Sequence, residues 1–162
     1  MVDEGWGRRA VDFAVLCEPQ NCREYVAIHQ RLALGDGVRL LDVACGSGLA
    51  IELARIQGAT CCGIDASQRL VAVARDRNPD SDIRVGDMKA LPWEDESFDV
   101  VTMWDVIEHL SDPLTELKRM HRVLKPNGLL AVSTMNVDAL FSSPGRSSQG
   151  RSATNAIAFA CP

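Results

Sequence analysis

One stretch, from Asp42 to Ala54, limits the possible folds most, because two glycines separate an apolar run from a helical pattern. Residues 38–41 are mostly apolar and are typical of a buried parallel strand. Gly46 and Gly48 then end the strand, and apolar residues recur at helical spacing after them. A helix that begins at such a turn points its first N–H groups, which carry partial positive charge, toward a ligand. The stretch therefore predicts a strand, a glycine turn and a helix that together bind a nucleotide-like ligand.

Three kinds of nucleotide-binding turn place glycines between a strand and a helix. A phosphate-binding P-loop needs Lys followed by Ser or Thr after its second glycine, and this stretch has neither. A dinucleotide-binding turn needs a third glycine, which would fall on Ile51. The pattern Asp-x-x-x-Gly-x-Gly, from Asp42 to Gly48, instead resembles the first motif of the class I S-adenosylmethionine-dependent methyltransferases of the small-molecule, type 11-like kind. On this motif alone, an ordinary strand-to-helix loop remains an alternative.

Later segments of the chain resemble the same family in the same order. The run 86–88, Gly-Asp-Met, follows an expected third strand, and residues 90–101 resemble the third and fourth family motifs. Glu-His-Leu at 108–110 follows a fourth strand, as in many members. The turn 125–128 resembles the closing Lys-Pro-Gly-Gly motif with asparagine in place of one glycine, and asparagine tolerates the same left-handed conformation. Four motifs in order weigh against the ordinary loop.

The alternation of strands and helices predicts an α/β fold with a doubly wound, mainly parallel sheet. Expected strands cover residues 38–43, 60–64, 82–86, 98–103 and 129–134, and expected helices cover 49–57, 68–77 and 113–124. The family resemblance, which covers residues 39–135, implies a Rossmann-like methyltransferase fold with the strand order 3-2-1-4-5. Such folds end with an antiparallel pair of strands, which we do not find in this sequence.

The chain divides into three expected parts. Residues 1–37 form a helical lead-in, with Asn21 as the N-cap of its last helix. Residues 38–135 form the S-adenosylmethionine-binding methyltransferase domain. Residues 136–162 are rich in Ser and Gly and are predicted to be a disordered or atypical tail, so that the chain resembles a methyltransferase truncated at its C-terminus. The strand 129–134 would then lie at an open sheet edge, which favours an edge-strand homodimer.

The resemblance assigns roles to single residues by their places in the family motifs. Asp65 follows the second strand, about 20 residues past the glycines, where a doubly wound fold places an acid that binds ribose hydroxyls. Asp65 could instead cap the next helix, as could Ser67. Asp87 with Met88 would hold adenine, and His109 could act as a general base or be a histidine bonded to a neighbouring loop. The predicted cofactor-binding residues are Asp42, Ala44, Gly46, Gly48, Asp65, Ala66, Asp87, Met88 and Trp104.

The resemblance implies transfer of a methyl group from S-adenosyl-L-methionine to a small-molecule acceptor by in-line displacement, without a metal ion. One alternative is a non-catalytic, cofactor-binding fragment of a methyltransferase. Another is a nicotinamide-dependent enzyme, which would use the same ribose-binding acid. Ile51 and the run 86–88 weigh against the nicotinamide enzyme.

Composition sets further limits. At 162 residues, 46% hydrophobic and 24% charged, the chain is long enough for one well-packed core. Its net charge of −5 argues against nucleic acid or an anionic membrane as a partner. No apolar run approaches the roughly 20 residues of a membrane span, the start does not resemble a signal peptide, and the cysteines form no Cys-x-x-Cys pair. We therefore expect a cytoplasmic protein with reduced, buried thiols.

Overall fold

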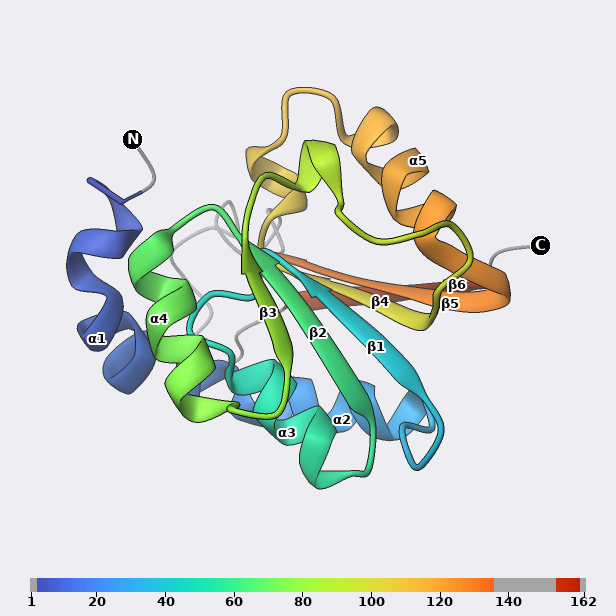
Figure 1. Ribbon diagram of the computed structural model, residues 1–162, viewed down its shortest axis with the longest axis horizontal. Helices are drawn as coiled ribbons and strands as arrows, with labels where there is room; N and C mark the ends of the chain where they lie inside the picture. The colour runs from blue at the N-terminus through green and yellow to red at the C-terminus, as the bar shows by residue number, and fades with distance from the viewer. Residues whose placement is uncertain (1–2, 136–153, 161–162) are drawn as a thin grey trace, which may run out of the picture.

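The structure is a computed structural model that describes residues 3–135 and 154–160. Its centre is one sheet of six strands in the order β3-β2-β1-β4-β5-β6 (Figure 1). β1 to β5 run parallel, and β6 is antiparallel to β5. The order of the parallel strands confirms the doubly wound α/β fold predicted from the sequence. The strands are β1 (Arg39–Val43), β2 (Thr60–Asp65), β3 (Asp82–Val85), β4 (Phe98–Trp104), β5 (Leu124–Met135) and β6 (Thr154–Ala160).

Helices cover both faces of the sheet, with α2, α3 and α4 on one face and α5 on the other (Figure 1). Neighbouring residues of β1 show the alternation, since Leu40 lies in the apolar cluster of Ile51 and Leu41 in that of Met120. Burial on both faces is typical of parallel sheets. The α-helices are α1 (Ala10–Asp12), α2 (Cys22–Arg31), α3 (Leu49–Ile56), α4 (Gln68–Arg77) and α5 (Pro113–Val123). The shorter turns are η1 (Trp6–Arg9), the π-helical η2 (Phe13–Cys17), η3 (Glu18–Asn21), η4 (Met88–Ala90) and η5 (Ile107–His109).

Helix boundaries follow from capping groups near the predicted positions. Ser67 caps α4 by accepting a hydrogen bond from the Leu70 N–H at 3.2 Å, and α4 covers its predicted range. Gly58 follows α3 with a φ of +99°, a conformation that ends a helix and favours glycine. Asn21 makes no capping hydrogen bond to α2, contrary to the prediction. Its side-chain amide instead donates to Asp105 Oδ2 at 3.4 Å, so it joins α2 to the end of β4.

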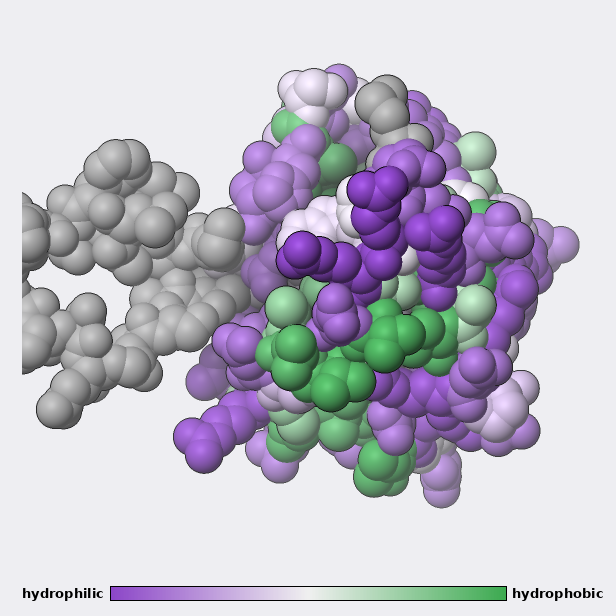
Figure 2. All heavy atoms as spheres, turned by 90° about the vertical axis from the view of Figure 1, so that its left-hand side faces the viewer, coloured by the Kyte–Doolittle hydropathy of each residue, from purple (hydrophilic) through white to green (hydrophobic). Residues whose placement is uncertain are grey.

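Residues 3–21, which we call the lead-in segment, form a series of short helical turns beside α4 (Figure 1). Their helical character was predicted. Ala10 and Ala14 are buried, and their small side chains let the segment lie close to the rest of the domain. Figure 2 shows apolar side chains gathered on this side of the molecule. Four larger apolar residues of the segment each expose more than half of their own surface, namely Trp6, Val11, Val15 and Leu16. These four side chains therefore contribute little to holding the segment in place.

The C-terminal edge of the sheet differs from the prediction. β6 pairs with residues 129–135 of β5, with Leu130 opposite Phe159 and Val132 opposite Ile157. The expectation of five strands with the whole antiparallel pair missing is therefore wrong, because one antiparallel strand is present. β5 is covered, and the proposed edge-strand homodimer loses its basis. The rest of the predicted tail, residues 136–153, 161 and 162, lies outside the described residues.

Buried thiols were expected, and three cysteines meet the expectation. Cys45, Cys61 and Cys62 are buried, and burial raises the pKa of each thiol, to about 12 for Cys61. Cys17 is exposed, so the expectation of burial fails there. No disulfide joins the cysteines of the described part of the chain. Within residues 3–135 and 154–160, no helix has the length and apolar character needed to cross a membrane.

The pairing of β5 with β6 predicts a distinct pattern of hydrogen exchange. Successive N–H groups of a strand point to opposite neighbours, so a strand with two partners protects every amide and an edge strand protects every second one. We expect slow exchange at each amide from Leu129 to Thr134, measured by NMR on a dilute sample. Protection at alternate positions only would mean that β5 is an open edge.

Candidate functional site

Three of the predicted cofactor-binding residues lie at the carboxyl ends of adjacent strands. Asp42 is in β1, Asp65 ends β2 and Trp104 ends β4. The strand pairing places Val43 beside Ile64 on one side and Met103 on the other, so these ends are neighbours. In open α/β sheets, ligands bind outside the carboxyl ends where the strand order reverses, and here β1 lies between β2 and β4. The geometry thus brings these residues to the expected edge of the sheet.

The turn between β1 and α3 has the left-handed backbone that its glycines predict. Ala44, Gly46 and Gly48 have φ values of +58°, +54° and +80°. A Cβ at Gly48 would lie 2.8 Å from Asn78 Nδ2, which donates to the Gly48 carbonyl at 2.9 Å. The second glycine therefore lets α4 approach the turn, in addition to meeting the backbone requirement. Only Gly46 faces the lead-in segment, where a Cβ would lie 3.1 Å from Phe13.

Asp65 connects the two turns that follow β1 and β2. Its Oδ2 accepts a hydrogen bond from the Gly46 N–H at 3.0 Å, and its Oδ1 accepts one from the Ser67 N–H at 2.8 Å. Burial raises the pKa of this carboxyl, and the two backbone donors partly offset that effect. An ionised carboxylate has about four acceptor positions, so Asp65 retains capacity for the hydroxyls of a ligand. Ser67, and not Asp65, accepts the capping bond of α4.

Asp42 is the most deeply buried carboxylate of the site, with 1% of its surface exposed. Its Oδ1 accepts a hydrogen bond from the Thr102 hydroxyl at 2.7 Å, while Oδ2 has no partner among the described residues. Burial raises the pKa of Asp42 to about 7, against the opposing effect of the Thr102 bond. The buried indole N–H of Trp104 lies near Asp42 and also lowers its pKa, although it makes no hydrogen bond of normal geometry in the described part of the chain. Buried polar groups are normally hydrogen-bonded, so these two atoms fit a polar ligand.

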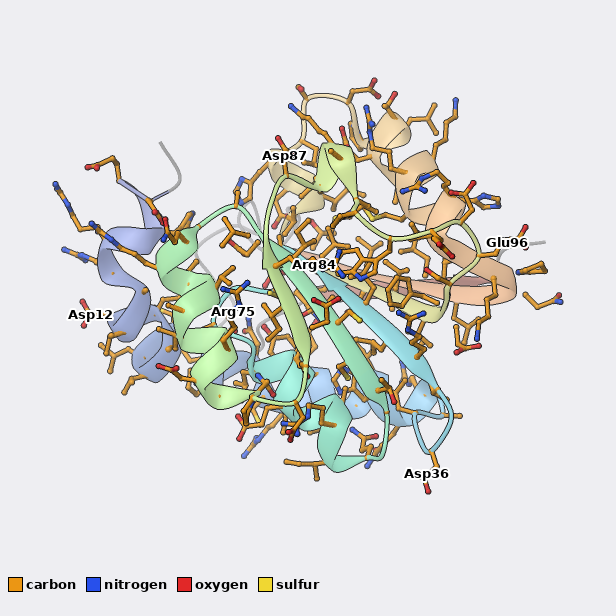
Figure 3. All side chains as sticks on the ribbon, in the orientation of Figure 1. Asp12, Asp36, Arg75, Arg84, Asp87 and Glu96 are labelled. Carbon is orange, nitrogen blue, oxygen red and sulfur yellow. The ribbon has the colours of Figure 1, made fainter. Side chains whose placement is uncertain are left out.

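The remaining predicted residues lie nearer to solvent. Asp87 is exposed and follows β3, and its Oδ1 accepts a hydrogen bond from the Lys89 N–H at 2.9 Å (Figure 3). Met88 is partly buried at the start of η4, and Ala66 is exposed after β2. His109 is exposed at the end of η5. Burial raises the pKa of the nearby Asp105 carboxyl, which the Ser133 hydroxyl and, less strongly, His109 lower. The structure therefore does not place His109 among the buried side chains of the site.

Two carboxylates near the site were not found by sequence reasoning. Glu18 of the lead-in segment is 3% exposed and accepts hydrogen bonds from Ser47 and Arg77. Asp105, with a φ of +52°, accepts a hydrogen bond from the Ser133 hydroxyl at 3.1 Å. Neither residue belongs to a periodic pattern. The left-handed backbone after β4 was the only signal that could have marked Asp105, and a sequence does not report it.

A separate cavity lies at the other end of the strands, where β4 and β5 begin. It has a volume of about 210 Å³ and is lined mostly by polar side chains that include Glu96, His121 and Lys125. In Figure 3, Glu96 lies at the right of the view, in the loop before β4, and Asp87 lies near the top, in the loop after β3. None of the predicted site residues lines this cavity. Within residues 3–135 and 154–160, no group of three or more His, Cys, Asp or Glu side chains is placed to hold a metal ion.

The fold and the site define a doubly wound α/β domain of the class that binds nucleotide-type ligands at the ends of its first two strands. Residues 41–132 match the family described as a methyltransferase domain, and the match covers more than half of the chain. The chain belongs to this family. The predicted family is thereby confirmed.

Curated relatives agree with the family. The chain is 42% identical over 105 residues to a ubiquinone biosynthesis O-methyltransferase of Cereibacter sphaeroides, which covers 62% of this chain and 42% of the relative. It is 38% identical over 125 residues to a Mycolicibacterium smegmatis protein named "Probable S-adenosylmethionine-dependent methyltransferase", which covers 76% of this chain and 48% of the relative. The chain thus spans less than half the length of these relatives.

Solved structures share the fold. The [4+2]-cyclase SpnF is 34% identical, with a TM-score of 0.64 over 70% of this chain and 44% of that chain. A SAM-dependent methyltransferase from Aquifex aeolicus has a TM-score of 0.69 over 78% of this chain and 73% of that chain, at 20% identity. The second likeness shows the fold alone.

The raised pKa of Asp42 predicts a pH-dependent stability difference. Because the folded state holds the proton more tightly than the unfolded state, the stabilisation from Asp42 is full below pH 4 and is lost as pH rises through about 7. Asp42→Asn does not titrate, so the ligand-free variant should gain roughly 2 to 3 kcal/mol of unfolding free energy relative to wild type between pH 5 and pH 8. Urea denaturation at both pH values measures this difference. Asp36→Asn, at an exposed carboxylate, is the control, and a constant difference for Asp42→Asn would show that Asp42 is ionised throughout.

Proposed function

We propose that this chain transfers the methyl group of S-adenosyl-L-methionine to a small-molecule acceptor. The observation that carries the proposal is the buried, unpartnered Oδ2 of Asp42 beside the glycine turn. A buried carboxylate oxygen without a partner is costly, and a ligand cation would relieve that cost. S-adenosyl-L-methionine has a cationic methionine part, so its ammonium group suits Asp42, either directly or through a water molecule.

Other residues of the site have complementary roles in this proposal. Asp65 accepts hydrogen bonds from the ribose hydroxyls, for which it keeps free acceptor positions. Asp87 and the backbone of Met88 hold the adenine ring after β3. Ala44, Gly46 and Gly48 shape the turn that borders the methionine part, while Ala66 and Trp104 border the ribose and the methyl group. The supports are their positions in the family motifs and at one edge of the sheet.

The cofactor supplies a methyl group on a sulfonium sulfur, which an acceptor atom attacks in line. The protein contributes by holding the acceptor near attack distance and by excluding water. We propose an acceptor hydroxyl, because the curated relatives include O-methyltransferases. His109, next to the loop after β4, accepts the hydroxyl proton as a general base. The non-catalytic alternative would leave the cofactor bound without turnover.

Ligand binding tests the cofactor site. S-adenosylhomocysteine should raise the melting temperature, increasingly at higher ligand concentration, and NAD should not, because a ligand that binds only the native state stabilises it. Asp65→Asn loses one of the charge-assisted bonds and should weaken S-adenosylhomocysteine by roughly 10- to 100-fold in calorimetry. Asp36→Asn, an exposed carboxylate at the opposite edge of the sheet (Figure 3), is the matched control. Equal weakening in both variants, or a shift with NAD alone, would rule out this cofactor assignment.

Turnover tests the reaction. With methyl-labelled S-adenosyl-L-methionine and 3,4-dihydroxybenzoate as a hydroxyl probe, we expect label in the phenol. His109→Asn should lower kcat by about 100-fold or more, the usual contribution of a general base, without a change in S-adenosylhomocysteine affinity. His121→Asn, at an exposed histidine of α5, is the control. Cofactor binding without transfer to phenol, amine or thiol probes would favour the non-catalytic alternative.

A further inference from the structure

We propose that Glu18 is a positioning residue of the cofactor site, which fixes the lead-in segment on the glycine turn so that cofactor affinity depends on it. The inference rests on the proposed cofactor binding and extends it to a residue outside the family match at 41–132. Glu18 would act through Ser47, its partner in the turn, rather than by contact with the cofactor.

The surroundings of Glu18 are those of a buried, fully engaged carboxylate. Only 3% of the residue is exposed. Its Oε2 accepts hydrogen bonds from the Ser47 hydroxyl and from Arg77 Nη1, the latter at 2.7 Å, and its Oε1 faces the Leu49 N–H at 3.4 Å. A buried charge is tolerated only when it is paired and hydrogen-bonded. Glu18 therefore joins three segments, namely the lead-in segment, the glycine turn and the end of α4.

Arg77, at the end of α4, also connects the glycine turn to the lead-in segment. Its Nη1 also donates to the Ser47 carbonyl at 3.0 Å, and its Nη2 donates to the Ala14 carbonyl at 3.4 Å. The side chain is 21% exposed, so water weakens its ion pair with Glu18 only partly. Removal of the Glu18 charge would weaken the acceptor that Arg77 and Ser47 share, and would leave Arg77 its longer ion pair with Glu52 at 3.4 Å. The turn would then be held less firmly against the lead-in segment.

The lead-in segment lies directly against Gly46 of the glycine turn. A Cβ at Gly46 would lie 3.1 Å from Phe13 Cε1 and 3.4 Å from Glu18 Oε1. Gly46 is also the donor to Asp65, the proposed ribose-binding residue. Because four of the larger apolar side chains of the segment are exposed, its position depends on the inner contacts of Phe13 and Glu18 and on Asp3, whose Oδ1 accepts a hydrogen bond from the Ser67 hydroxyl at 2.5 Å. The position of the segment and the shape of the turn are thus coupled.

Coupling between two sites is reciprocal. If the lead-in segment helps the turn to bind the cofactor, the bound cofactor must in turn stabilise the segment on the domain. The charge of Glu18 also reaches the site, where it raises the pKa of Asp42 and of Asp65 in addition to the effect of burial. Two measurable quantities follow, the affinity of the cofactor product in a Glu18 variant and the protection of the segment by ligand.

The test compares Glu18→Gln with Glu4→Gln, which neutralises an exposed carboxylate of the same segment. Calorimetry with S-adenosylhomocysteine should give affinity about 10- to 100-fold weaker for Glu18→Gln, the effect of losing a charged hydrogen bond, and unchanged affinity for Glu4→Gln. Affinity of Glu18→Gln within twofold of wild type would overturn the inference. Absence of binding in the wild type itself would overturn the proposed function as well, which separates the two failures.

Hydrogen exchange on the wild-type protein gives a second readout that does not depend on a variant that folds. Saturating S-adenosylhomocysteine should slow exchange of the amides of residues 13–18 by about tenfold or more. The amides of residues 34–37, at the opposite edge of the sheet, should be unaffected. A purely structural Glu18 would leave residues 13–18 equally protected with and without ligand, and that result would overturn the inference.

Discussion

The hydrogen bonds from two backbone N–H groups to the carboxylate of Asp65 are the interaction on which the site depends. They join the turn after β1, through Gly46, to the turn after β2, through Ser67. Without them, a buried carboxylate at the end of β2 would be unstable. With them, the first turn keeps its left-handed backbone and Ser67 is held where its hydroxyl caps α4. Asp65 therefore supports both the proposed cofactor site and the start of α4.

The glycines of the turn serve packing as well as ligand approach. Gly48 lets α4 come close enough for Asn78 to bond its carbonyl, and Asn78 in turn ends α4 from a fully buried position. Gly46 lies under Phe13 of the lead-in segment. A motif that the sequence marks for ligand binding is thus also the place where three segments pack together. We therefore expect side chains at Gly46 and Gly48 to be poorly tolerated.

The central fold could be predicted because its signals are local. Ser67 is a residue type that favours the N-cap position, so it marks the start of α4 in the sequence. Leu40 and Leu41 lie in two different apolar clusters, because successive side chains of a strand point to opposite faces. β6 was missed because Thr154–Ala160 is short and follows a Ser- and Gly-rich stretch. Its partner, β5, is distant in sequence, and such pairing leaves no periodic mark.

The candidate site was predictable only where residues lie in a motif. Asp42 and Asp65 were placed correctly at strand ends, although their hydrogen bonds and raised pKa values depend on the packed structure. Glu18 could not be found, because its hydrogen-bond partner Arg77 is 59 residues away in sequence. Asn21 was predicted to cap a helix, and its amide instead bonds Asp105 from a distant strand end. Contacts between distant segments are what the sequence does not display.

Fold alone does not determine the reaction, since a [4+2]-cyclase shares this architecture at 34% identity. The central claim is therefore the location of the ligand, and an NMR titration with S-adenosylhomocysteine tests it most directly. The account predicts large shifts for the backbone amides of Gly46, Ser47 and Ser67, and none for Glu96 and Lys125 at the opposite cavity. Large shifts at Glu96 and Lys125 without change at Gly46 would contradict it.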